Sequence, residues 1–341
     1  MNSLQRIGAI MSGQLPDQVP LIINLFDQGS KELDMNIEDY YKSGENVAKG
    51  QIALHKKFNH DCVWSMFYVA HDIKYLGAKK MIFYQDGPPN LGELLIKNYK
   101  DIENLKIPES IYDLPEFKDQ KKCAEILKNE FAGKVPVLGA VNSSMTLPIL
   151  LMGMEGWLNL LLTGPKDIRD LLLEKCHQFT QKHIEAHRKS GVDIIAYTAS
   201  GLTLDIIPHK IFSELGLSWI KKDITCAGPQ GIVYFNGGGK INGTINEIIQ
   251  QTSLRAFYIN TRDSISDAKQ IIKDQGILIA PINDIMLTKW NEKEIDFEVK
   301  KIMDEGKQGG GFMMGTLMTP YLIPEENIFA LISAGRKYGK Y

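Results

Sequence analysis

Short apolar runs alternate with longer amphipathic stretches along the 341 residues of this chain. Eight of these runs are rich in β-branched and aromatic residues and nearly free of polar positions, as in parallel strands that are buried on both faces. They span residues 19–26, 62–70, 135–141, 192–198, 232–236, 256–261, 277–282 and 310–316. Helical periodicity fills the later intervals, at 171–191, 208–224, 245–253, 266–276, 292–308 and 324–339. Several of these stretches end in basic residues followed by glycine, which is a typical helix stop.

This alternation predicts an α/β protein with a TIM (β/α)8 barrel, formed as a single domain over residues 1–341. A doubly wound open sheet is the alternative. The absence of a Gly-x-Gly-x-x-Gly turn after the first run counts against a dinucleotide-binding version of it. The longest interruption, residues 76–134, is expected to form an excursion. We expect this excursion and the N-terminal segment to cover parts of the barrel mouth.

Composition narrows the class of protein further. Lysine and arginine total 39 against 41 aspartates and glutamates, so no basic face indicates a nucleic-acid partner. No apolar stretch is long enough for a signal peptide or a membrane span. The four cysteines are scattered without Cys-x-x-Cys pairing, which is typical of a reducing compartment. We therefore expect a cytoplasmic protein with neither nucleic acid nor membrane as partner, and a homodimer is compatible with the sequence.

Chemistry in a TIM barrel lies at the C-terminal ends of the strands. Amides, hydroxyls and aromatic rings dominate there, with few charges, which favours a flat and mostly neutral ligand. Polar candidates for ligand contact are Tyr68, His71, Asn236, Asn260, Asp263 and Asp284. Candidates for holding the ligand are Phe26, Trp64, Phe67, Asn142 and Tyr197. The strands at 232–236, 256–261 and 277–282 all end in amides and carboxylates, so inward-facing copies would form a polar ring.

Other histidines and acids have plainer interpretations. His183 and His187 are spaced to share one helical face, but no glutamate follows His183 as in zinc proteases. We interpret them, with His177, as part of a solvated face on an outer helix. Asp205 precedes a helix that starts at Pro208, so capping is the favoured role for its carboxylate.

Four segments then resemble the uroporphyrinogen decarboxylase superfamily, in order and nearly end to end. They are residues 76–90 (LGAKKMIFYQDGPPN), 135–165, 191–223 and 309–339. Decarboxylases of this family carry an Arg-Gln-x-Gly-Arg cluster after the first strand, which holds the carboxylates of the porphyrinogen. This chain has Phe26-Asp27-Gln28-Gly29-Ser30 there, and no arginine between Arg6 and Arg169. Porphyrinogen decarboxylation is therefore not the expected reaction.

Within the superfamily, the chain resembles the cobalamin-dependent methyltransferases. Those that methylate thiols hold zinc with His-x-Cys after the fifth strand and a further cysteine after the eighth. The resemblance places Phe235, Gly237, and Leu317 or its neighbour, at these ligand positions. The stretch IVYFNGGGKING at 232–243 therefore resembles a zinc site whose ligands have been replaced. Zinc held by other strand-end groups stays open.

The remaining resemblance is to methyltransferases that move a methyl group from a donor to the cobalt(I) of a separate corrinoid protein. It implies a small donor, an aromatic methyl ether above all, and the anaerobic O-demethylation that releases a phenol. Methyl transfer from a corrinoid to a thiol or folate is one alternative, and a binding barrel without catalysis is another. The six polar candidates would then stabilise the leaving oxygen. Gly237, Gly238 and Gly239 would let the corrinoid approach closely.

Overall fold

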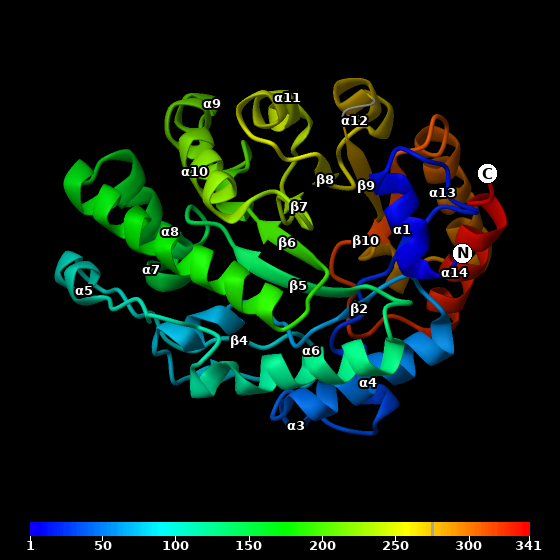
Figure 1. Cartoon of the computed structure of the whole chain (residues 1–341), viewed down its shortest axis with the longest axis horizontal. Helices are drawn as coiled ribbons and strands as arrows, with labels where there is room; N and C mark the ends of the chain where they lie inside the picture. The colour runs from blue at the N-terminus through cyan, green and yellow to red at the C-terminus, as the bar shows by residue number, and fades with distance from the viewer. Residues whose placement is uncertain (274–275) are drawn as a thin grey trace.

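Eight parallel strands form one curled sheet in the computed structural model, which describes residues 1–273 and 276–341 (Figure 1). The strands are β1 (Leu21–Ile22), β2 (Val63–Trp64), β5 (Val137–Asn142), β6 (Ile194–Thr198), β7 (Ile232–Phe235), β8 (Ala256–Tyr258), β9 (Ile277–Ile282) and β10 (Phe312–Thr316). Their order is β1-β10-β9-β8-β7-β6-β5-β2. The backbone amide of Asp61 donates to the carbonyl of Leu21 at 2.9 Å, which links the two end strands. The barrel prediction is confirmed, and each predicted run contains one strand.

Helices form a layer outside the strands (Figure 1). They are α1 (Ser3–Met11), α2 (Gln28–Glu32), α3 (Ile37–Tyr40), α4 (Gly44–Phe58), α5 (Tyr99–Asn104), α6 (Lys118–Phe131), α7 (Leu147–Leu162), α8 (Lys166–Lys189), α9 (His209–Ile211), α10 (Leu217–Ala227), α11 (Asn242–Gln251), α12 (Ile265–Ile272), α13 (Glu292–Gly306) and α14 (Glu325–Tyr338). Side chains of Ser43, Ser264 and Asn291 cap α4, α12 and α13. Part of the predicted helix at 266–276, residues 274–275, lies outside the described residues.

The helix α1 lies across the N-terminal end of the barrel. The guanidinium of Arg6 donates to the carboxylate of Asp61 at 2.7 Å, and the amide of Leu4 donates to the carbonyl of Lys134 at 3.0 Å. Asp61 and Lys134 both precede strands, so this end is the floor of the barrel. The expectation that the N-terminal segment covers the mouth is therefore wrong. Its amphipathic helix instead buries Ile7 and Ile10 under the barrel.

The excursion at 76–134 borders the mouth and also completes the helix layer. A two-stranded antiparallel hairpin, β3 (Met81–Ile82) and β4 (Asn90–Leu91), is followed by α5 and α6. The segment after β4 contacts α7, where the backbone N–H of Ile96 donates to the carbonyl of Leu151 at 2.9 Å, next to Ile149 and Leu150 at the barrel mouth. The ammonium of Lys175 on α8 donates to the carbonyl of Glu103 at 2.7 Å. This contact fixes α5 against α8.

Candidate functional site

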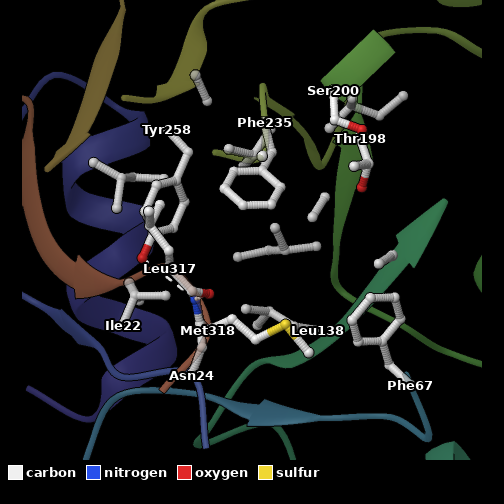
Figure 2. A pocket seen from close by; sticks show the side chains of 18 of the residues that line it. Ile22, Asn24, Phe67, Leu138, Thr198, Ser200, Phe235, Tyr258, Leu317 and Met318 are labelled. Atoms are coloured by element: carbon white, nitrogen blue, oxygen red, sulfur yellow. Dashed lines mark hydrogen bonds between the residues drawn. The ribbon is translucent and has the colours of Figure 1, made fainter. Parts of the chain in front are cut away.

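A cavity of about 660 Å³ occupies the interior of the barrel. Its walls are the inward-facing strand residues, and Figure 2 shows the rings of Phe235, Tyr258 and Phe67 directed into it from different sides. At the mouth it is bordered by Gly238, Leu317 and other loop residues that follow the strands. Among the described residues, only Asp284 and Arg255 bring a carboxyl or a cationic group to its lining. The site is therefore predominantly apolar.

The alternation along each strand decides which candidates reach this cavity. On β6, Ala196 and Thr198 line the cavity, whereas Tyr197 faces the helices. The hydroxyl of Tyr197 donates to the carboxylate of Asp223 on α10 at 2.6 Å. The assignment of Tyr197 to ligand binding is therefore corrected, because the pleat turns it into the outer core.

Three of the predicted aromatic residues cluster at the mouth. Ring centroids of Phe26 and Trp64 lie 4.9 Å apart, and those of Phe26 and Phe67 lie 5.3 Å apart. All three line the cavity, as does Asn142. The indole Nε1–H of Trp64 donates to Asn24 Oδ1 at 3.0 Å, which fixes the indole plane. These rings can pack against a flat apolar ligand.

The aromatic residues on the opposite wall were not predicted as ligand contacts. Phe235 and Tyr258 have ring centroids 5.3 Å apart and both line the cavity. The side-chain amide of Asn24 donates to the Tyr258 hydroxyl at 3.3 Å and to the carbonyl of Leu317 at 3.1 Å. The alternation Ala256-Phe257-Tyr258 on β8 is the sequence signal that could have identified Tyr258 as an inward-facing residue.

Asp284 is the one predicted acid that the structure brings to the cavity. It follows β9, is 5% exposed, and accepts a hydrogen bond from the backbone N–H of Met318 at 2.7 Å. Burial raises the pKa of this carboxyl, while backbone N–H groups, that of Met318 first, oppose the rise. A carboxyl with a raised pKa at the edge of an apolar cavity is suited to act as a general acid.

The other polar candidates support loops or pack in the outer core. Asp263 accepts from the backbone N–H groups of Ile241 and Asn260, both at 3.0 Å. Asn236 donates to the carbonyl of Lys240 at 3.0 Å. None of Asn236, Asn260 and Asp263 lines the cavity, so the polar ring predicted from three strand ends does not form. Asn260 accepts from the backbone N–H of Arg262 at 3.0 Å.

Tyr68 and His71 lie behind the cavity wall. Their rings are 4.4 Å apart, and both side chains are buried and absent from the lining. Next to them, the side-chain amide of Asn142 donates to Asp72 at 2.8 Å. Burial raises the pKa of Asp72 to about 6. Asp72 can therefore orient Asn142. The structure does not bring Tyr68 or His71 to the cavity.

The three consecutive glycines, residues 237–239, differ in whether the structure requires a glycine at their position. Gly237 has φ of +60°, and a Cβ there would lie 2.9 Å from that of Ser200. A Cβ on Gly239 would lie 2.1 Å from the hydroxyl oxygen of Thr203. Gly238 lines the cavity, and beyond its chain neighbours no described atom lies within 4 Å of the place that a Cβ would occupy. Of the three, Gly238 is therefore the one free of a local packing requirement.

We expect Gly238→Ala to leave the fold intact and Gly239→Ala to destabilise it. The Gly239 substitution forces the Thr203 side chain to move and costs about 1–3 kcal/mol of unfolding free energy. Urea unfolding of both variants measures this difference. Equal midpoints would contradict the role assigned to Gly239.

The positions aligned with the zinc ligands meet at one place. Phe235, Gly237 and Leu317 all line the cavity mouth, and Figure 2 shows Phe235 and Leu317 at it. None of these side chains has a ligating atom, so the residues present do not fit a thiolate–zinc centre. Within residues 1–273 and 276–341, no group of three or more His, Cys, Asp and Glu side chains could hold a metal ion.

The helix α8 corrects the interpretation of its three histidines as a solvated face. His177, His183 and His187 are 7%, 1% and 0% exposed, so they do not form a solvated face. His187 packs on Gly139 of β5, where a Cβ would approach the ring to 2.7 Å. The spacing of Cys176, Thr180, His183 and His187 matches one buried stripe, a signal present in the sequence.

The predicted capping role of Asp205 is also corrected. Its carboxylate pairs with the guanidinium of Arg262 at 2.6 Å, and no described side chain caps the helix that follows Pro208.

Buried histidines, on α8 and elsewhere in the chain, predict that the folded state loses stability in acid. Burial lowers the pKa of His60 and His71 to about 3 and that of His187 to about 4. Their unfolded pKa is near 6.5, so the unfolded chain takes up protons first as pH falls below about 6.5. Their contribution is thus fully present above pH 6.5 and is lost between there and pH 3–4.

Three buried carboxyls act in the opposite direction. Burial raises the pKa of Asp27 and Asp72 to about 6 and also raises that of Asp284, so these groups stabilise the folded chain as pH falls. Burial lowers the pKa of His55 and His183 as well, so five histidines outnumber three carboxyls, and each uncompensated group contributes about 1.4 kcal/mol per pH unit. We expect the unfolding free energy, measured by urea titration, to fall from pH 6.5 to pH 5. A constant value over this range would contradict the assignment.

The fold and site define an α/β barrel whose interior is a predominantly apolar cavity. The chain belongs to the uroporphyrinogen decarboxylase family, since residues 2–338 match the family described as "Uroporphyrinogen decarboxylase (URO-D)". It is 24% identical over 244 residues to the uroporphyrinogen decarboxylase of Geobacter sulfurreducens, with 68% of each chain covered. For that of Geobacter metallireducens the identity is 23% over 252 residues, with 71% of each covered.

Solved structures show the same fold. A methyltransferase from Methanosarcina mazei superposes with a TM-score of 0.86 over 99% of both chains, at 16% sequence identity. A B12-independent methionine synthase from Shewanella superposes with a TM-score of 0.58 over 88% of both chains, at 12% identity. Along the described residues, no helix is long and apolar enough to cross a membrane.

Proposed function

We propose that this protein is a methyltransferase that takes a methyl group from an aromatic methyl ether and passes it to the corrinoid of a separate protein. The observation that carries this proposal is the site itself, an apolar, aromatic-walled cavity with the carboxyl of Asp284 at its mouth. The end-to-end likeness to a protein named as a methyltransferase supports it.

The charges in the cavity disfavour porphyrinogen decarboxylation. A substrate with many carboxylates needs several cationic partners to compensate its loss of water. Among described residues that line the cavity, Arg255 alone is cationic, and it precedes β8 at the floor. The segment after β1 supplies the buried carboxyl of Asp27 where decarboxylases of the family carry arginine.

Methyl transfer needs few charges, but it needs a proton at the leaving oxygen. As the bond between the methyl carbon and oxygen breaks, its electron pair stays on the oxygen, and the carboxyl of Asp284 supplies the proton that gives a neutral phenol. The cobalt(I) of the corrinoid, when its carrier is bound, supplies the nucleophile. Thr198 and Ser200 present hydroxyls at the same mouth and can orient the ether (Figure 2).

The rim around the mouth is suited to a protein partner. Large apolar side chains are exposed on the loops after four strands and on the hairpin, namely Val69, Ile82, Tyr84, Leu204, Ile206, Ile285 and Leu322. Exposed apolar residues gathered on one side indicate an interaction surface. Gly238 also borders the mouth, and beyond its chain neighbours no described atom lies within 4 Å of the place that a Cβ would occupy.

The thiol direction is the weaker alternative, because Phe235, Gly237 and Leu317 cannot activate a thiol through zinc. A direct assay separates the candidates. The purified protein is mixed with free cobalamin reduced to cobalt(I) and with methoxybenzene or 2-methoxyphenol. Formation of methylated cobalamin, followed by absorbance, together with equimolar phenol supports the proposal. Methyl transfer from methylated cobalamin to a thiol instead supports the alternative, and neither product with any donor indicates a binding protein.

A further inference from the structure

The cavity is much deeper than a methoxybenzene requires. Its lining begins at the rim with Gly238 and Met318 and continues without interruption to Gln230, Ser253 and Arg255, which precede strands β7 and β8. Ile7 and Met11 of α1 also line it. Because α1 lies across the N-terminal end, the cavity extends through the barrel from the mouth to the floor.

Small side chains account for this depth. Eight-stranded barrels are normally filled by layers of bulky branched side chains. Here Ala140, Ala196 and Ala256 stand at inward-facing positions of three strands. The first two are in register across the sheet, since Ala140 pairs with Ala196, which pairs in turn with Val233 of β7. On this side of the barrel, the layer of inward-facing side chains is therefore too small to fill the interior.

The burial pattern along the strands shows the same space independently. On β6, the inward-facing Ile194, Ala196 and Thr198 remain partly accessible, whereas the outward-facing Ile195 and Tyr197 are 2% and 0% exposed. On β7 the pattern repeats, with Val233 and Phe235 accessible on the inside. In a packed barrel both faces would be buried.

From this geometry we propose that the cavity takes a ligand with an elongated apolar body, specifically a phenol methyl ether that carries a long alkyl substituent opposite the methoxy group. The methyl end faces the mouth beside Asp284, and the alkyl chain lies past Ala196 toward α1. The identity of the reacting end rests on the proposed methyl transfer. The apolar occupant of the interior does not depend on it.

Binding of the demethylated products tests the occupant without any turnover. A series of 4-alkylphenols of rising chain length is titrated into the protein by calorimetry. Each methylene that enters the interior should tighten binding about threefold to fourfold, until the chain reaches the floor. Affinity that does not depend on chain length, or no binding of any member, would overturn the proposal.

Two substitutions should shorten the usable length by different amounts. Ala196→Leu narrows the cavity beside the middle of β6, and Ala256→Leu narrows it beside the start of β8, next to Arg255. We expect the gain per methylene to stop at a shorter chain in Ala196→Leu than in Ala256→Leu. Ala53→Leu, on α4 and away from the cavity lining, is the matched control and should follow the wild-type series. Leucine variants that bind long chains as the wild type does would contradict the placement.

The outcomes for the two proposals are separable. Length-dependent binding without methyl transfer to cobalamin leaves the apolar site standing and removes the proposed function. Transfer from methoxybenzene combined with length-independent binding does the reverse. If a leucine variant does not fold, Ala196→Val and the wild-type series test the same question, namely whether the alkyl chain lies beside position 196.

Discussion

Asp284→Asn should lower the rate of methyl transfer about 10²- to 10³-fold at saturating donor. The substitution keeps the shape of the side chain and an oxygen that accepts from the Met318 N–H, but it removes the one carboxyl found among the described residues of the cavity lining. The wild-type rate should fall as pH rises through the raised pKa of Asp284, because the acid form is lost. This descending limb should be absent in the variant. The measurement is the initial rate of phenol release across a pH series.

The leaving group provides the control for this prediction. A 4-nitrophenyl methyl ether releases a stable phenolate and needs little help from an acid, so the variant should lose much less rate with it than with methoxybenzene. An equal loss for both donors would indicate that Asp284 positions the donor or supports Met318. Full activity with methoxybenzene would exclude Asp284 from the chemistry.

Periodicity predicted the barrel because parallel strands that are buried on both faces produce apolar runs with few interruptions. All eight runs contain strands, although β1 and β2 have only two residues each within their longer runs. The N-terminal segment, which forms α1, was assigned to the wrong end of the barrel for a physical reason. An amphipathic helix shows in its sequence that it covers an apolar surface, but the ion pair from Arg6 to Asp61 that selects the floor is a long-range contact.

The site was less predictable because loop geometry decides which strand-end side chain turns inward. Asp263 and Asp284 follow neighbouring strands, yet Asp263 binds the backbone of the adjacent loop, and Asp284 reaches the cavity. The distance of each aspartate from its strand in the sequence predicts neither of these positions. Strict alternation within a strand does carry the information, and applying it to β6 would have placed Tyr197 outside and Thr198 inside.

A buried carboxylate that supports the mouth from outside has the largest expected effect on stability. Asp223 on α10 is 0% exposed and accepts from the Ser144 hydroxyl at 2.9 Å and the Tyr197 hydroxyl at 2.6 Å. His177 Nδ1 lies 2.6 Å from its other oxygen. Through these contacts Asp223 joins α8, β6 and the loop that follows Asn142 at the cavity.

Asp223→Ala should therefore lower the unfolding free energy by about 3–5 kcal/mol, because it leaves several buried donors without an acceptor. Tyr197→Phe is the matched control, since it removes one donor and leaves Asp223 bonded to the others. It should cost only about 0.5–1.5 kcal/mol. Urea unfolding at pH 7 measures both. If the two variants lose the same stability, Asp223 does not hold this network together, and the position of the loop after β5 must depend on packing alone.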